Sequence, residues 1–165
     1  MIVTPEELAA IEAQAIEEYP SECCGMVMIR GDERRLLRCR NIQDELHAKD
    51  PERHVRDSHT AYSVDIGDLR RMEQLSSEGF ALAVIYHSHI DVGAYFSPTD
   101  KSQAMHGRDP KNHEPLWLDT TYIVVSVRKE PDKVWVDESK AFRWNGARRD
   151  FVETSFPVGV GGPRS

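Results

Sequence analysis

Residues 80–100 constrain the fold and chemistry of this chain more than any other segment. An apolar run over residues 80–86 is long enough for a buried strand and leads directly into His87-Ser88-His89. Side chains two residues apart on a strand point to the same face, so the two histidines can converge while Ser88 points the other way. The sequence therefore predicts a buried strand with two imidazoles at its C-terminal end.

A helix start follows these histidines after a short loop. Ser97, Pro98 and Asp100 have the residue types favoured at the N-cap, the first helical position and the third. Residues three apart share a helix face, so Ser97 and Asp100 can both face the histidines. Two ring nitrogens and one carboxylate, with water at the fourth position, form a catalytic zinc site, whereas structural sites usually have four protein ligands. We therefore predict one zinc ion held by His87, His89 and Asp100.

A hydrolytic zinc site also needs a group that takes a proton from water, and Glu22 is the candidate. Pro20 ends the preceding helix, because the residue before a proline disfavours the helical conformation. An apolar strand starts near Cys24, so Glu22 would lie at the start of that strand and could project into a cleft. The local sequence also fits a second interpretation, in which Glu22 is an ordinary solvated glutamate.

Length and composition indicate one globular domain. The 165 residues suffice for a hydrophobic core, with 39% hydrophobic and 30% charged residues. We expect no membrane span, because no apolar run approaches about 20 residues, and no secretion signal at the N-terminus. The net charge of −7 argues against a nucleic-acid partner. Three cysteines, an odd number, indicate reduced thiols and a cytoplasmic location.

Periodicity and turn signals predict an α/β (α+β) fold. A Thr4-Pro-Glu-Glu capping box starts the first helix, and Asp65 caps a second. We expect helices over residues 5–18, 65–78 and 97–107, and strands over 24–30, 35–41, the histidine strand, 120–128, 134–137 and 141–144. Residues 1–150 then form the catalytic domain, and residues 151–165 a flexible C-terminal tail.

Two polar segments, residues 44–58 and 109–119, are expected to be loops. His47, His54 and His59 lie in or next to the first one. Their spacing is not typical of a metal site, so we interpret all three as solvated.

Two motifs carry a resemblance to a known family over residues 1–145. The chain resembles the JAMM (MPN-plus) metalloproteases through Pro20-x-Glu22-x-Cys24-Gly25 and His87-x-His89-x7-Ser97-x2-Asp100. The resemblance implies a curved mixed β-sheet flanked by helices, with a cytidine-deaminase-like architecture. It also implies zinc ligands at His87, His89 and Asp100, a general base and later acid at Glu22, and an oxyanion-stabilising hydroxyl at Ser97.

The resemblance further implies a peptidase or isopeptidase acting on ubiquitin-like proteins. This chain is compact, like the stand-alone prokaryotic members, which are associated with small sulfur-carrier proteins ending in Gly-Gly. The expected reaction is hydrolysis of the peptide bond after that Gly-Gly, which removes C-terminal residues or an amino-acid adduct. We expect this carrier as the partner, without nucleic acid or membrane; the sequence does not define the oligomeric state.

Two other function classes stay open. The protein could be a zinc hydrolase of a small-molecule amide, or a non-catalytic MPN-type module that binds a ubiquitin-like partner. The complete ligand set argues against the binding module. The absence of a His-x-Glu…Pro-Cys-x-x-Cys signature argues against a deaminase.

The loop between the ligands departs from the family pattern. Ile90 stands where many relatives have proline, and the loop over residues 90–96 is expected to influence substrate choice. Tyr95 and Phe96 either line the substrate approach or pack the loop.

Two smaller features also bear on the site. Cys24 is interpreted as a small buried residue rather than a member of the metal cleft. Gly161-Gly162 in the tail resembles the end of a sulfur carrier, which leaves self-processing as an alternative.

Overall fold

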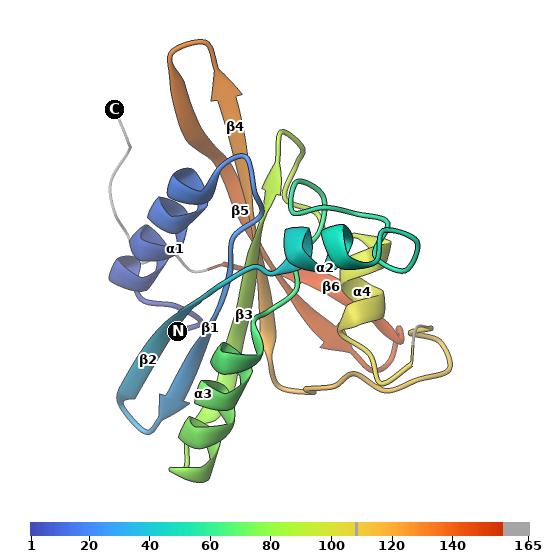
Figure 1. Ribbon diagram of the computed structural model, residues 1–165. Helices are drawn as coiled ribbons and strands as arrows, with labels where there is room; N and C mark the ends of the chain where they lie inside the picture. The colour runs from blue at the N-terminus through green and yellow to red at the C-terminus, as the bar shows by residue number, and fades with distance from the viewer. Residues whose placement is uncertain (108, 157–165) are drawn as a thin grey trace.

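A six-stranded mixed sheet forms the centre of the molecule (Figure 1). The computed structural model describes residues 1–107 and 109–156. The strand order is β2-β1-β3-β4-β5-β6, in which β3 and β4 run parallel and the other neighbouring pairs antiparallel. The strands are β1 (Cys24–Arg30), β2 (Glu33–Cys39), β3 (Ala81–Ile90), β4 (Thr121–Glu130), β5 (Lys133–Asn145) and β6 (Asp150–Thr154). The mixed sheet flanked by helices confirms the predicted fold class.

The helices lie on both faces of this sheet (Figure 1). One face is covered by α1 (Pro5–Glu18), whose buried residues Leu8, Ile11 and Ala15 pack on apolar side chains of β1, β3 and β4. The opposite face packs against α3 (Ile66–Ser77) and the segment that follows α4 (Pro98–Gln103). The short helix α2 (Gln43–Lys49) lies near α4 (Figure 1). No helix in the described part of the chain is long and apolar enough to cross a membrane.

Strand alternation divides the core between these two faces. Val27 of β1 and Tyr86 of β3 point towards α1, whereas Met26 and Ile85 point towards the other face. Residues of β3 and β4 are buried on both faces, as is typical of strands with a parallel neighbour in the middle of a sheet. The central strand β3 is therefore buried from Val84 to Ile90, which includes its C-terminal end.

The predicted boundaries of the first two long helices are close to the observed ones. The Thr4 side chain accepts a hydrogen bond from the Glu7 amide at 3.1 Å, and Glu7 returns one to the Thr4 amide at 2.9 Å. Asp65 caps α3 by accepting from the Gly67 amide at 2.8 Å. Gly79 follows α3 with a φ of +90°, a conformation that favours glycine.

Several element predictions were wrong. Residues 44–58 contain most of α2, which lacks the apolar periodicity that would have identified it. The predicted strands at 134–137 and 141–144 are one strand, β5, because backbone pairing with β4 continues past the polar residues between them. The helix at Ser97 ends at 103 rather than near 107, and β2 covers residues 33–39 rather than 35–41.

The expected boundary between domain and tail was also wrong. Residues 151–154 belong to β6, which pairs with β5 and buries Phe151 against Phe96 and Tyr122. Propensity gave little signal for this strand, because one buried aromatic in five residues does not make an alternating pattern. The Gly161-Gly162 pair lies outside the described residues.

Candidate metal centre

The C-terminal end of β3 presents both histidines to one face of the sheet. His87 is paired with Cys24 of β1 on one side and Val124 of β4 on the other, and all three side chains are buried. Burial of Cys24 confirms its interpretation as a core residue. Ser88 points to the opposite face, where its hydroxyl oxygen accepts a hydrogen bond from the Cys23 amide at 2.8 Å. The predicted alternation along this strand is confirmed.

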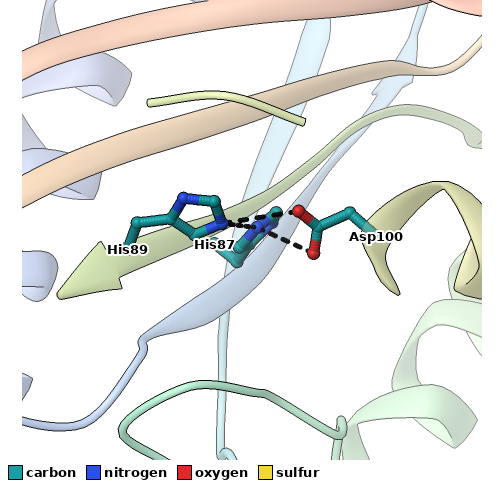
Figure 2. Close-up of side chains that lie close together, drawn as sticks. All are labelled: His87, His89 and Asp100. Carbon is teal, nitrogen blue, oxygen red and sulfur yellow. Dashed lines mark hydrogen bonds and ion pairs between the residues drawn. The ribbon is translucent and has the colours of Figure 1, made fainter. Parts of the chain in front are cut away.

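Asp100 reaches the histidines from the first turn of α4 (Figure 2). Its Oδ1 lies 3.2 Å from His87 Nε2, and its Oδ2 lies 3.4 Å from His89 Nε2. The two Nε2 atoms are 3.2 Å apart. The ligand atoms of all three residues lie within 4.8 Å of one another, and all three side chains are buried. The structure therefore brings the three predicted ligands to one point.

A capping box sets the direction of the Asp100 side chain. Asp100 Oδ2 accepts a hydrogen bond from the Ser97 amide at 2.8 Å, while Ser97 Oγ accepts from the Asp100 amide at 3.1 Å. This reciprocal pair turns the carboxylate back towards the loop that precedes the helix. The same geometry that starts α4 therefore points Asp100 at β3.

The hydrogen bonding of His89 fits a ligand to a divalent metal ion. Its Nδ1 lies 3.0 Å from the carbonyl oxygen of Gly93, which only accepts, so Nδ1 carries the proton. Nε2 is then the ring nitrogen that remains for a metal ion, and it faces His87 and Asp100. Imidazole nitrogens and a carboxylate converging on one buried point match a catalytic zinc site, and a carbonyl partner on the far ring nitrogen is the usual support for such a ligand.

Electrostatics keep Asp100 ionised in this buried position. Burial on its own would raise the pKa of the Asp100 carboxyl, but His87, His89 and the Ser97 hydrogen bonds together outweigh it. The net result is a pKa well below the ordinary value. An ionised carboxylate is the form that binds a metal ion.

Glu22 is buried beside this cluster, with 5% of its surface exposed, so the solvated interpretation was wrong. Its backbone amide donates to the Ser58 carbonyl at 2.7 Å, and its carbonyl accepts from the Asn41 side chain at 2.9 Å. Burial raises the pKa of Glu22 to about 9, and the negative charge of Asp100 adds to this rise, while Arg56 opposes it. The side chain therefore lies in the same cleft as the metal centre and holds a proton near neutral pH.

The cleft next to the centre has a volume of about 130 Å³. Glu22, Ser97 and Asp100 line it together with His89. All five predicted site residues thus lie in or directly next to this one cleft, since His87 contacts Asp100.

The two aromatic residues of the loop between His89 and Asp100, Tyr95 and Phe96, lie in different environments. Phe96 is buried and packs on Phe142 and Phe151. Tyr95 is half exposed, lines the cleft and contacts the His89 ring edge-on, with ring centroids 4.9 Å apart. Phe96 therefore anchors the loop in the core, and Tyr95 faces the approach to the metal centre.

Hydrogen bonds from the sheet hold this loop in place. Ser126 of β4 donates to the Val92 carbonyl at 2.6 Å, and the Ala94 amide donates to Glu138 of β5 at 3.0 Å. These bonds flank Gly93, the residue whose carbonyl accepts from His89. The sheet thus positions both a histidine and the group that orients its ring.

Three further residues of the cleft were missed in the sequence. Arg56, His59 and Tyr62 line it from the segment after α2. Tyr62 also stacks on His87, with ring centroids 4.7 Å apart. His59 is exposed as expected, but faces the cleft rather than open solvent alone. Nothing in the local sequence separates these residues from an ordinary polar loop, because only the fold brings them to the histidines.

Comparisons with known proteins agree with this geometry. A family model described as prokaryotic homologues of the JAB domain matches residues 4–142. The fold is similar to that of protein DSY2949 from Desulfitobacterium hafniense, with a TM-score of 0.59 and 20% identity over 96% of this chain and 92% of that one. A protein from Salinibacter ruber gives a TM-score of 0.56 and 22% identity over 94% and 89%. A search of curated proteins finds no match.

Replacing Asp100 should abolish tight zinc binding without removing the helix cap. The Asp100→Asn side chain keeps an oxygen that can accept from the Ser97 amide, but loses the charge that faces the histidines. We expect zinc affinity to fall roughly a hundredfold or more, measured by titration against a competing chelator. Asp65→Asn, which alters the cap of α3 instead, should bind zinc like the wild type. Wild-type affinity in Asp100→Asn would refute the ligand assignment.

Glu22 should make the chelator-treated protein less stable as pH rises. Below about pH 4.5 Glu22 is protonated in both folded and unfolded states and contributes nothing. Between that pH and about 9 the unfolded chain releases the proton while the folded chain retains it, so stability falls.

The variant Glu22→Gln cannot lose stability in this way. Its melting temperature should exceed that of the wild type by a margin that grows from pH 5 to pH 9, as measured by circular dichroism. Glu6→Gln, at an exposed position of α1, provides the control for the loss of one carboxyl group. A margin for Glu22→Gln that is constant with pH would contradict the buried position of Glu22.

Proposed function

The chain belongs to the family of prokaryotic JAB-domain homologues, and on this premise we propose that it is a zinc-dependent peptidase. Its proposed substrate is a small ubiquitin-like sulfur-carrier protein, cleaved at the peptide bond after the C-terminal Gly-Gly. The observation that carries the proposal is the buried convergence of two histidines and Asp100 beside Glu22 in a single cleft. A bound zinc ion would supply Lewis acidity, lowering the pKa of a water and polarising the scissile carbonyl.

Glu22 is the proton carrier of the proposed reaction. Burial raises its pKa to about 9. The positive charge of a bound zinc ion would lower that pKa, so that the carboxylate could accept and return a proton near neutral pH. It lines the same cleft as Asp100 and His89, so a proton taken from water on one side can be delivered to the departing amine. Glu22 thereby serves as base first and as acid afterwards.

Ser97 supplies a hydrogen-bond donor to the same cleft. Its Oγ accepts from the Asp100 amide, and this contact leaves the hydroxyl proton available. The residue lines the cleft. Its hydroxyl can therefore donate to the negative charge that develops on the carbonyl oxygen of the scissile bond.

The size of the cleft is compatible with a glycine-rich substrate. A volume of about 130 Å³ holds one small group next to the metal centre. Glycine brings no side chain and lets a backbone approach closely. Tyr95, half exposed at the same place, gives an extended tail an aromatic surface to pack against.

A cleavage assay tests the proposed function directly. The zinc-loaded protein is incubated with a sulfur-carrier protein that has one alanine added after its Gly-Gly, and the mass of the carrier is measured. We expect loss of that alanine, and no loss with Glu22→Gln, which should retain one zinc. Turnover by Glu22→Gln near the wild-type rate would refute its role, and an uncut carrier would refute the proposed reaction.

Loss of the Ser97 hydroxyl should slow the reaction by about 100- to 1,000-fold in kcat. Ser97→Ala also removes a helix cap, which costs about 1 kcal/mol of stability. Thr4→Ala is the matched control, because Thr4 forms the same capping box on α1, whose start is built from Thr-Pro-Glu-Glu. Thr4→Ala should lose similar stability and keep kcat. An equal loss of kcat in both variants would show that Ser97 acts only through folding.

A further inference from the structure

We propose that Arg56 is a specificity-determining residue that binds the free carboxylate of the amino acid released from the substrate. This inference rests on the proposed peptidase function and names its leaving group. Such a residue would favour cleavage of a C-terminal amino acid over cleavage of an isopeptide bond. A C-terminal amino acid carries a carboxylate next to its leaving nitrogen, whereas the side-chain nitrogen of lysine does not.

Arg56 lies at the junction of the cleft and a second, larger hollow. It lines the metal-side cleft together with Glu22 and Asp100, and its positive charge is close enough to lower the pKa of Glu22. The second hollow has a volume of about 650 Å³ and begins at the same residue. Ala61, Thr99 and Gln103 line both spaces as well. A leaving group that departs from the metal centre in this direction therefore passes Arg56.

The guanidinium of Arg56 has no carboxylate partner among the described residues. Most arginines in the described part of the chain form an ion pair, including Arg34 with Glu7 at 2.7 Å and Arg128 with Asp137 at 2.8 Å. Arg56 makes a single long hydrogen bond, 3.4 Å to the Thr60 carbonyl. Its remaining donors are available to a ligand in the cleft.

The hollow beyond Arg56 is cationic. Arg53 and His54 line it, and none of the described residues that line it is acidic. This is unusual for a chain with a net charge of −7. An anionic leaving group therefore meets favourable charge along this path, although most of the protein surface would repel it.

A cation at this position would favour such a substrate against the carboxyl groups of the metal-side cleft. The carboxyl groups of Glu22 and Asp100 line the same cleft as Arg56. Uncompensated, these groups would repel a carboxylate held one residue from the scissile bond. The planar fork of arginine matches a carboxylate with two parallel hydrogen bonds. The same guanidinium would also disfavour a cationic side chain near it, which adds selectivity through repulsion.

The test compares two synthetic peptides that end in Gly-Gly-Ala, one with a free carboxylate and the other with a carboxamide. With the zinc-loaded wild type, we expect a KM about three- to tenfold lower for the carboxylate peptide. Arg56→Gln should raise the KM for that peptide to the value for the carboxamide. Equal KM values in the wild type, or an equal rise for both peptides in Arg56→Gln, would overturn the inference.

Substitution of two other arginines distinguishes an effect of the position of Arg56 from an effect of net charge. Arg53→Gln removes a cation that lines only the second hollow. Arg70→Gln removes an exposed arginine of α3 that lines neither the cleft nor the second hollow. Both should keep the preference for the carboxylate peptide. Loss of the preference in all three variants would show a general charge effect and overturn the role of Arg56.

Binding distinguishes failure of this inference from failure of the proposed function. If neither peptide is cut, calorimetric titration of both peptides into the zinc-loaded wild type and Arg56→Gln decides the matter. Tighter binding of the carboxylate peptide that disappears in Arg56→Gln would support Arg56 while refuting peptidase activity. Equal binding of the two uncut peptides would refute both the role of Arg56 and the proposed peptidase function.

Discussion

The architecture of the centre depends on one buried carboxylate, that of Asp100. It accepts from the Ser97 amide, which starts α4, and it faces the Nε2 atoms of His87 and His89. Burying an isolated carboxylate costs several kcal/mol, so this position is stable only while the carboxylate is hydrogen-bonded or paired with a cation. The helix start and the metal centre are therefore one unit, and neither geometry can change without the other.

Sheet topology explains why Asp100 returns to the strand that carries the histidines. Because β3 and β4 are parallel, the chain between them must cross from one end of the sheet to the other. This crossover contains α4 and passes over the face that His87 and His89 share (Figure 1). On its other edge β3 pairs with β1, which begins two residues after Glu22. The strand that carries His87 and His89 thus lies between the segments that carry Glu22 and Asp100.

How far the sequence predicts the site depends on whether a residue is placed by local or by distant contacts. His87, His89 and Asp100 follow from strand alternation and a capping box, both of which operate over a few residues. Glu22 does not, because the hydrogen bonds that hold its backbone come from Ser58 and Asn41, which are distant in sequence, and only the resemblance to a family indicated its role. The helix α2 and the strand β6 were missed for a related reason: their sequences have weak periodicity, and tertiary pairing stabilises them.

The candidate ligands and the residues proposed to select the substrate lie on different kinds of backbone. The candidate ligands lie on a central strand and at a capped helix start. Displacing these elements costs free energy, so they can hold the geometry that a metal ion requires. Arg56 and Tyr95 lie on irregular segments at the rim of the same cleft, after α2 and after β3. The segment after α2 also supplies the Ser58 carbonyl that holds Glu22. Substitutions in these two segments can therefore change which leaving group is accepted while the ligand set stays constant, provided that the backbone at Ser58 is preserved.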